Sequence, residues 1–299
     1  MRYETMKLTV PGQTEGPAEL KLYLLDAISV APEKKRPMVV VIPGGGYHRR
    51  SDREKEPIVM QFLSMGYHAC ILEYSVAPVR FPVSLRELAL AVATIREHAR
   101  QWHVDEQMIL PCGFSAGGHL ACSMGTFWNR PIAWEAIGKT PEQVKPNGLI
   151  LCYPVITSGE YRHAGSFEQL LGEETDAGLR RAAADGERRS GDARSETDLL
   201  ELVSLEKQVT EDMPPVFLWH TVTDETVPVE NSLLLAAALK KHGVSFEMHL
   251  YPSGRHGLAL ATEETAGNRS NSVEPCCQSW ISLVQCWVVH INKAQCENR

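Results

Sequence analysis

Gly113-Phe114-Ser115-Ala116-Gly117 is the stretch that decides the fold, because it fits the G-x-S-x-G pattern at which a strand turns sharply into a helix. Residues 108–112 before it form a short apolar run typical of a buried strand. Residues 118–124 after it are small and apolar, as in a buried helix. The two glycines let strand and helix approach closely while the serine occupies a strained turn. The stretch therefore predicts a nucleophilic Ser115; a glycine-rich turn with an incidental serine is the alternative.

Composition and charge limit the classes of protein that the chain can belong to. It has 299 residues, 43% of them apolar, and a formal net charge of -7. This length suits one large α/β domain or two small ones. An acidic chain without a basic cluster argues against nucleic acid as a partner. No uninterrupted apolar run reaches the roughly 18 residues that a membrane span needs, and residues 1–7 lack an apolar signal-peptide core, so we expect a cytoplasmic location.

The eight cysteines show no metal-site spacing. Cys70, Cys112 and Cys152 lie inside apolar runs, where cysteine behaves as a small hydrophobic residue. We therefore expect reduced structural thiols and no bound metal.

Apolar runs typical of strands recur along the chain, near residues 6–10, 20–25, 38–42, 69–74, 108–112, 149–153, 216–220 and 247–251. From residue 38 onward they alternate with helical patterns, which predicts an α/β fold with a mostly parallel eight-stranded sheet covered on both faces. The first two runs have no helix between them and predict an antiparallel edge pair. The helical patterns cover residues 81–102, 229–241 and 272–292, and residues 51–54 fit a capping box before another helix.

One segment interrupts this alternation. About 60 residues separate the strand ending at Tyr153 from the one starting at Val216, which predicts a cap-like insertion over residues 155–213. Residues 172–198 contain five arginines and eight acidic residues among 27. A mobile cap and a surface excursion without a role both remain open for this charged segment, with short helices expected at 166–171 and 199–203.

A serine becomes a nucleophile when a base accepts its proton and an acid orients the base. Both are expected in loops that follow later strands. Asp224 follows the strand at 216–220 and is the predicted acid, with its neighbour Glu225 as the alternative. His256 lies in a glycine-flanked loop after the last strand and is the predicted base.

Four of the remaining histidines are assigned other roles. His220 and His249 fall within strands and are expected to be structural. His119 lies one turn into the helix after Ser115 and is expected to pack or to form hydrogen bonds. His48 is placed at the substrate pocket together with Tyr47.

A glycine run follows the strand at 38–42, where backbone N–H groups could stabilise a developing negative charge. The predicted oxyanion hole consists of the N–H groups of Gly45, Gly46 and Ala116, each such donor being worth about 3 to 4 kcal/mol in the transition state. A flexible glycine turn is the alternative, but it does not explain the position of the run.

Together these motifs resemble the α/β-hydrolase superfamily over nearly the whole chain from residue 20 onward. Residues 43–47, 113–119, 224–228 and 256–258 are similar to acetyl xylan esterase-like proteins, within the carbohydrate-esterase and hormone-sensitive-lipase-like group. Two positions depart from the lipase-like pattern: Pro43 replaces the usual histidine and Phe114 a frequent aspartate. Both departures favour the acetyl-esterase branch. Residues 73–78 occupy the place of the Asp-Tyr-Arg-Leu-Ala-Pro segment of those esterases, and the resemblance implies a structural role in shaping the pocket wall.

The resemblance implies a single α/β-hydrolase domain over residues 1–299 and a serine esterase that removes short acyl groups, above all acetyl, from a carbohydrate or a similar alcohol. No cofactor or metal is implied, and the partner is a small-molecule or oligosaccharide ester, not nucleic acid or a membrane. An amidase, arylformamidase-like or peptidase-like enzyme of the same fold is the first alternative. A non-catalytic binding protein of this fold is the second, and the sequence leaves a homo-oligomer open.

Overall fold

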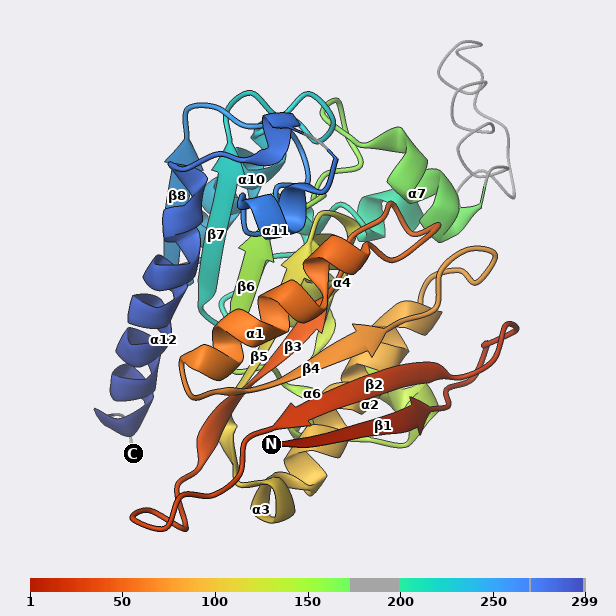
Figure 1. Cartoon of the computed structure of the whole chain (residues 1–299). Helices are drawn as coiled ribbons and strands as arrows, with labels where there is room; N and C mark the ends of the chain where they lie inside the picture. The colour runs from red at the N-terminus through yellow and green to blue at the C-terminus, as the bar shows by residue number, and fades with distance from the viewer. Residues whose placement is uncertain (173–198, 269, 298–299) are drawn as a thin grey trace.

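The computed structural model describes residues 1–172, 199–268 and 270–297 and contains one eight-stranded sheet (Figure 1). Its strand order is β1-β2-β4-β3-β5-β6-β7-β8. The two pairs at the N-terminal edge, β1 with β2 and β2 with β4, are antiparallel, and all other pairs are parallel. The predicted fold class and the antiparallel edge pair are thereby confirmed. The strands are β1 (Arg2–Leu8), β2 (Ala18–Leu24), β3 (Arg36–Ile42), β4 (His68–Glu73), β5 (Val104–Phe114), β6 (Leu149–Cys152), β7 (Val216–Thr221) and β8 (Phe246–Tyr251).

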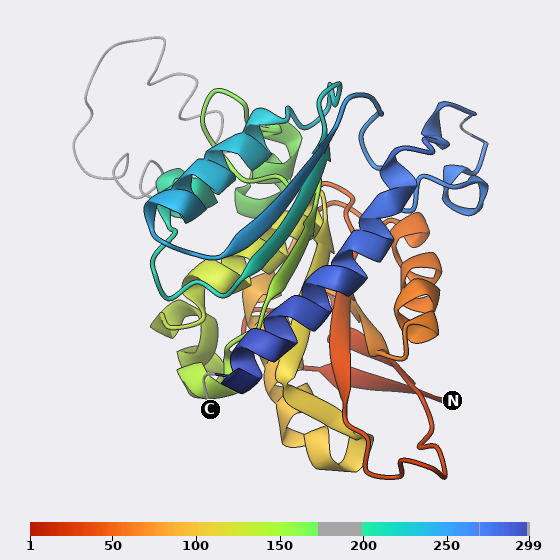
Figure 2. The ribbon, with the colours of Figure 1, turned by 90° about the vertical axis from the view of Figure 1, so that its left-hand side faces the viewer.

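Helices cover both faces of the sheet, as Figure 2 shows with α12 and α1 on one side and α10 on the other. Parallel strands that are buried on both faces appear in the sequence as continuous apolar runs. The helices are α1 (Glu56–Ser64), α2 (Val83–Glu97), α3 (Ala99–Trp102), α4 (Ala116–Phe127), α5 (Pro131–Trp134), α6 (Pro141–Val144), α7 (Ala164–Leu171), α10 (Glu230–Lys241), α11 (Glu263–Ala266) and α12 (Trp280–Glu297).

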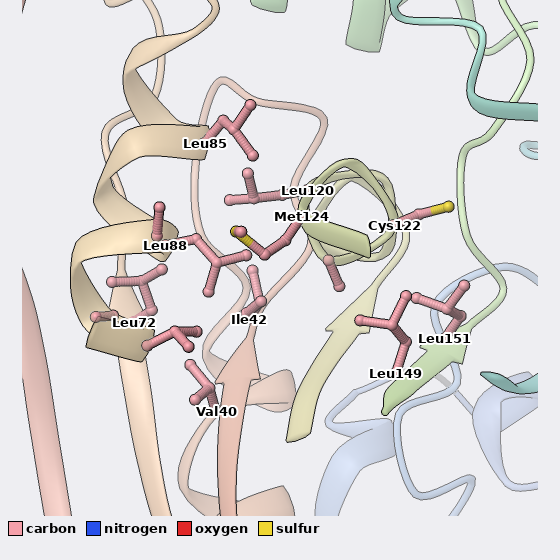
Figure 3. Packing of buried hydrophobic residues seen from close by; sticks show 14 of the residues in the cluster. Val40, Ile42, Leu72, Leu85, Leu88, Leu120, Cys122, Met124, Leu149 and Leu151 are labelled. Carbon is pink, nitrogen blue, oxygen red and sulfur yellow. The ribbon is translucent and has the colours of Figure 1, made fainter. Parts of the chain in front are cut away.

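The helix α4 that follows Ser115 lies in the middle of the core, with all twelve of its residues buried. Leu120 and Met124 on α4 pack with Leu88 of α2 and Ile42 of β3, while Leu151 of β6 lies on the other side of α4 (Figure 3). Because interiors are packed as densely as organic crystals, this environment fixes the helix and the turn before it.

Three sequence predictions about helices need correction. The capping box at residues 51–54 is absent, because Ser51 makes no side-chain capping bond and Glu54 turns into the interior instead. The predicted helix over 81–102 is divided at His98 into α2 and α3. The last helix begins at Trp280, because residues 270–272 and 277–279 form only single 3₁₀ turns.

The predicted insertion at 155–213 is described in part. It contains α7, as expected for 166–171, and residues 199–202 are helical. Most of the charged segment, residues 173–198, lies outside the described residues. Among the described helices, none has the length and apolar character needed to cross a membrane.

Candidate active site

Ser115 occupies the strained turn that the sequence predicts. Its backbone φ is 54° and ψ is -117°, a conformation that a residue with a side chain rarely adopts. A Cβ on Gly113 would lie 2.1 Å from the Gly117 carbonyl oxygen, and one on Gly117 would lie 2.1 Å from the Ile42 carbonyl oxygen. Glycine is therefore required at both positions for α4 to approach β5 and β3 and to hold Ser115 at the end of the sheet.

The structure brings the three predicted catalytic residues into one hydrogen-bonded chain. The Ser115 Oγ lies 2.7 Å from His256 Nε2, and His256 Nδ1 lies 2.6 Å from Asp224 Oδ2. The carboxylate can only accept, so Nδ1 carries the hydrogen and Nε2 is left to accept the serine proton. Residues 141 and 32 positions apart in the sequence thus meet with the geometry of a nucleophile, its base and an orienting acid.

Asp224 is held as a carboxylate by its surroundings. Burial would raise its pKa, but hydrogen bonds from His220, His256 and the Val227 N–H outweigh burial and hold the pKa well below its ordinary value. Its Oδ1 accepts the N–H groups of Thr226 at 3.0 Å and Val227 at 2.9 Å. The neighbouring Glu225, the alternative acid in the sequence, is exposed instead.

His220 also contacts the acid, which sequence reasoning missed. It is fully buried, as expected for a structural histidine. Its Nε2 donates to the Val227 carbonyl oxygen at 3.0 Å and lies 3.3 Å from Asp224 Oδ2, while Nδ1 bonds Ser232 Oγ at 2.7 Å. His220 therefore holds the acid loop in place. His249 is partly buried and bonds Glu247 at 2.8 Å.

The predicted oxyanion loop lies directly against the nucleophile. A Cβ on Gly44 would lie 2.9 Å from the Cβ of Ser115. Gly45 and Gly46 have φ values of 128° and 65°, a region that favours glycine. Among the described residues, none accepts a hydrogen bond from the N–H of Gly45, Gly46 or Ala116. These three N–H groups are thus free to bind an oxygen that gains negative charge.

The two predicted pocket residues behave differently. His48 is exposed beside the glycine loop. Tyr47 is buried, and its hydroxyl donates to His119 Nδ1 at 2.8 Å, so it supports the loop from within and does not offer its side chain to a pocket. His119 Nε2 donates to the Val203 carbonyl oxygen at 2.9 Å, which confirms its hydrogen-bonding role. Burial lowers the pKa of His119 to about 4 and keeps the imidazole neutral.

His163 and Ser166 lie near the oxyanion loop without having been predicted there. Ser166 Oγ is 3.9 Å from the position of a Cβ on Gly46, and His163 Nδ1 bonds that Oγ at 2.8 Å. Burial and the nearby His256 lower the pKa of His163. No motif marks these two residues, since only the packing of α7 brings them to the site. In the described ranges, no cluster of His, Cys, Asp or Glu forms a metal site.

The fold and the site together define an α/β-hydrolase whose structural neighbours are esterases. A family model described as BD-FAE matches residues 25–239, and the chain belongs to this family.

Three relatives illustrate the similarity. The chain is 35% identical over 238 residues to an endo-1,4-beta-xylanase B of Butyrivibrio fibrisolvens, covering 77% of this chain and 34% of that protein. It is 24% identical over 261 residues to an acetylxylan esterase of Xylanibacter ruminicola, covering 86% of this chain and 47% of that protein. The crystal structure of an acetyl ester-xyloside bifunctional hydrolase from Caldicellulosiruptor lactoaceticus superposes with a TM-score of 0.76 at 33% identity, covering 97% and 96% of the two chains. The chain thus spans less than half the length of the xylanase B and of the acetylxylan esterase.

Proposed function

We propose that this chain is a serine carboxylic-ester hydrolase that removes short acyl groups, above all acetyl, from a carbohydrate or a similar alcohol. The observation that carries the proposal is the hydrogen-bonded chain from Ser115 through His256 to Asp224, next to three N–H groups that have no acceptor among the described residues. This arrangement supports acyl transfer through a covalent intermediate.

In the proposed mechanism, Ser115 Oγ attacks the ester carbonyl carbon while His256 Nε2 accepts the hydroxyl proton. The carbonyl oxygen becomes an oxyanion and is bound by the N–H groups of Gly45, Gly46 and Ala116. His256 then gives its proton to the departing alcohol oxygen, which leaves an acyl-enzyme. A water molecule, deprotonated by His256, attacks this ester, and the carboxylic acid leaves as Ser115 regains its proton.

The acetyl and carbohydrate part of the proposal is supported by the relatives. One of them is named an acetylxylan esterase, and another is described as an acetyl ester-xyloside bifunctional hydrolase. Pro43 and Phe114, where lipase-like sequences differ, point the same way. An amidase of this fold would use the same residues, because the two reactions differ only in the leaving group.

The decisive experiment replaces Ser115 with alanine. We expect Ser115→Ala to lower kcat on p-nitrophenyl acetate by about a millionfold and to abolish labelling by a fluorophosphonate probe, because the nucleophile is lost. Ser123→Ala is the matched control, since this serine on the same helix is buried, its hydroxyl donates to the His119 carbonyl oxygen, and its loss should keep the activity. Near-normal hydrolysis by Ser115→Ala would refute the proposal, and a wild-type chain that the probe does not label would favour a binding protein.

Substrate panels test the finer claims. We expect acetylated xylo-oligosaccharides and p-nitrophenyl acetate to be hydrolysed with higher kcat/KM than long-chain p-nitrophenyl esters. A preference for an aryl formamide or a peptide over every ester would instead assign the chain to the amidases.

A further inference from the structure

A buried carboxylate connects the oxyanion loop with the loop of the catalytic base. Glu54 is only 2% exposed. Its Oε2 accepts the Gly44 N–H at 2.8 Å, and its Oε1 accepts the Tyr153 hydroxyl at 2.8 Å. The Tyr153 oxygen in turn accepts the Ala259 N–H at 2.9 Å, three residues after His256. We call Glu54 and Tyr153 the Glu54–Tyr153 strut.

The direction of every hydrogen bond in the strut is fixed by chemistry. The N–H groups of Gly44 and Ala259 can only donate. Tyr153 therefore accepts from Ala259 and must give its single hydroxyl proton to Glu54. Both Glu54 oxygens accept, which is the pattern of a carboxylate and one that no neutral side chain of the same size can reproduce.

The cationic side chains next to Glu54 in the sequence bind other groups, so the Gly44 N–H and the Tyr153 hydroxyl are its donors. Lys55 binds Asp52 and Glu73, and Arg53 donates to the carbonyl oxygens of Thr265 and Gly257. In the part of the chain that the structure describes, no cation forms an ion pair with Glu54, so its two hydrogen bonds must offset the cost of burying the carboxylate.

The ends of the strut lie at the reacting groups. Gly44 packs against Ser115 and immediately precedes the two oxyanion glycines. The Tyr153 ring meets the His256 ring edge to face, with centroids 5.2 Å apart at 73°. Tyr153 itself adopts a φ of 38° directly after β6, a conformation that its contacts must maintain.

We infer that Glu54 and Tyr153 are positioning residues that hold the oxyanion loop and the His256 loop in register with Ser115. The inference rests on the proposed function, because it assumes that these two loops perform the reaction. Neither residue touches the reacting atoms through a polar group; each acts through the backbone that it binds.

The test compares Tyr153→Phe, Glu54→Gln and the double variant with wild type. Tyr153→Phe keeps the ring against His256 but deletes both hydrogen bonds of the hydroxyl. We expect each single variant to lower kcat by about 10-fold to 100-fold while KM changes less than about twofold, because small displacements of catalytic groups are costly. The double variant should lose less than the product of the single losses, since both changes break one link.

Two further measurements separate positioning from a general loss of stability. Fluorophosphonate labelling of Ser115 should slow in parallel with kcat. Alkyl acetates should lose more activity than p-nitrophenyl acetate, because a poor leaving group depends more on the proton from His256. Tyr23→Phe is the matched control: Tyr23 lies on β2, and the change deletes another tyrosine–glutamate hydrogen bond, to Glu56 at 3.1 Å. This variant should leave kcat unchanged.

The outcomes distinguish the strut from the proposed function. If wild type is labelled and hydrolyses esters, but Tyr153→Phe and Glu54→Gln keep kcat within about twofold, the strut is merely structural and the inference is wrong. If Tyr153→Phe does not fold, Glu54→Gln decides alone, because the glutamine amide has nearly the same shape as the carboxylate and retains one acceptor oxygen. A wild-type chain without esterase activity overturns the proposed function first.

Discussion

At the scale of single residues, the site depends on which groups hold a charge and which stay neutral. Asp224 is kept ionised by donors from its own loop and from two histidines. His119, one helical turn after Ser115, is kept neutral by burial. Each state has a measurable consequence.

Replacing Asp224 with asparagine tests whether the acid acts by orienting His256 or only by filling its place in the loop. Asp224→Asn retains the volume but can present an N–H to His256, which favours the wrong tautomer of the base. We expect kcat to fall about 10⁴-fold while the protein stays folded. Glu225→Gln, one position along in the same loop and exposed, should keep kcat within about twofold. Equal losses in the two variants would contradict the assignment of the acid.

The buried His119 should make stability depend on pH. Unfolded, its imidazole takes up a proton near pH 6.5, whereas in the folded protein it remains neutral down to about pH 4. Between these values the unfolded state binds more protons, so the free energy of unfolding falls as the pH is lowered, by up to about 3 kcal/mol in total. Urea unfolding of wild type and His119→Gln between pH 7 and 4.5 measures this. The variant should show a pH slope smaller by about one proton, and identical slopes would contradict the prediction.

At the scale of secondary-structure elements, the approach of α4 to the sheet sets the position of Ser115. This approach depends on the absence of a side chain at Gly117, where a Cβ would clash with the backbone oxygen of Ile42. A backbone atom inside a sheet cannot move aside as the end of a flexible side chain can.

Gly117→Ala should therefore lower both stability and activity. We expect a loss of about 3 kcal/mol in the free energy of unfolding, because overpacking forces helix and strand apart. Gly165→Ala is the control: this glycine lies in α7, and the nearest atom to its added Cβ would be 3.7 Å away. Alanine favours a helix, so this variant should be as stable as wild type or slightly more. Chemical denaturation compares the two.

At the scale of the whole molecule, one carboxylate ties the antiparallel edge of the sheet to the site. Glu73 at the end of β4 accepts Lys21 of β2 at 3.0 Å, Lys55 at 2.9 Å and Arg50 at 2.8 Å. Burial would raise the pKa of Glu73, but hydrogen bonds from Lys55 and Lys21 outweigh it and lower the pKa.

Glu73→Gln should destabilise the protein by about 3 kcal/mol, because it leaves three cations without their common partner, one of them with a side chain only 10% exposed. The value is at the low end of such losses, because Lys21 and Arg50 keep partial contact with water. Glu97→Gln is the control. Its ion pair with Lys139 is exposed, so less than about 1 kcal/mol should be lost. Thermal unfolding of both variants tests the comparison.

The sequence by itself determined the eight strands, their alternation with helices, and the order of Ser115, Asp224 and His256 along the chain. These features are local: a buried strand shows as an apolar run, and a turn or a glycine loop shows as a short motif. The alternation of strands with helices predicts a parallel sheet. In such a sheet, residues that follow successive strands meet at one end.

Only the tertiary structure decided which polar groups are buried and what they bind. Glu54 fits a capping box in the sequence, but its partner Tyr153 lies 99 positions away, and the interior offers the carboxylate two donors that the local turn cannot. Tyr47 turned inward for the same reason, since His119, 72 positions away, accepts its hydroxyl. Such contacts leave no local pattern, because they depend on the packing of segments that the chain brings together only when it folds.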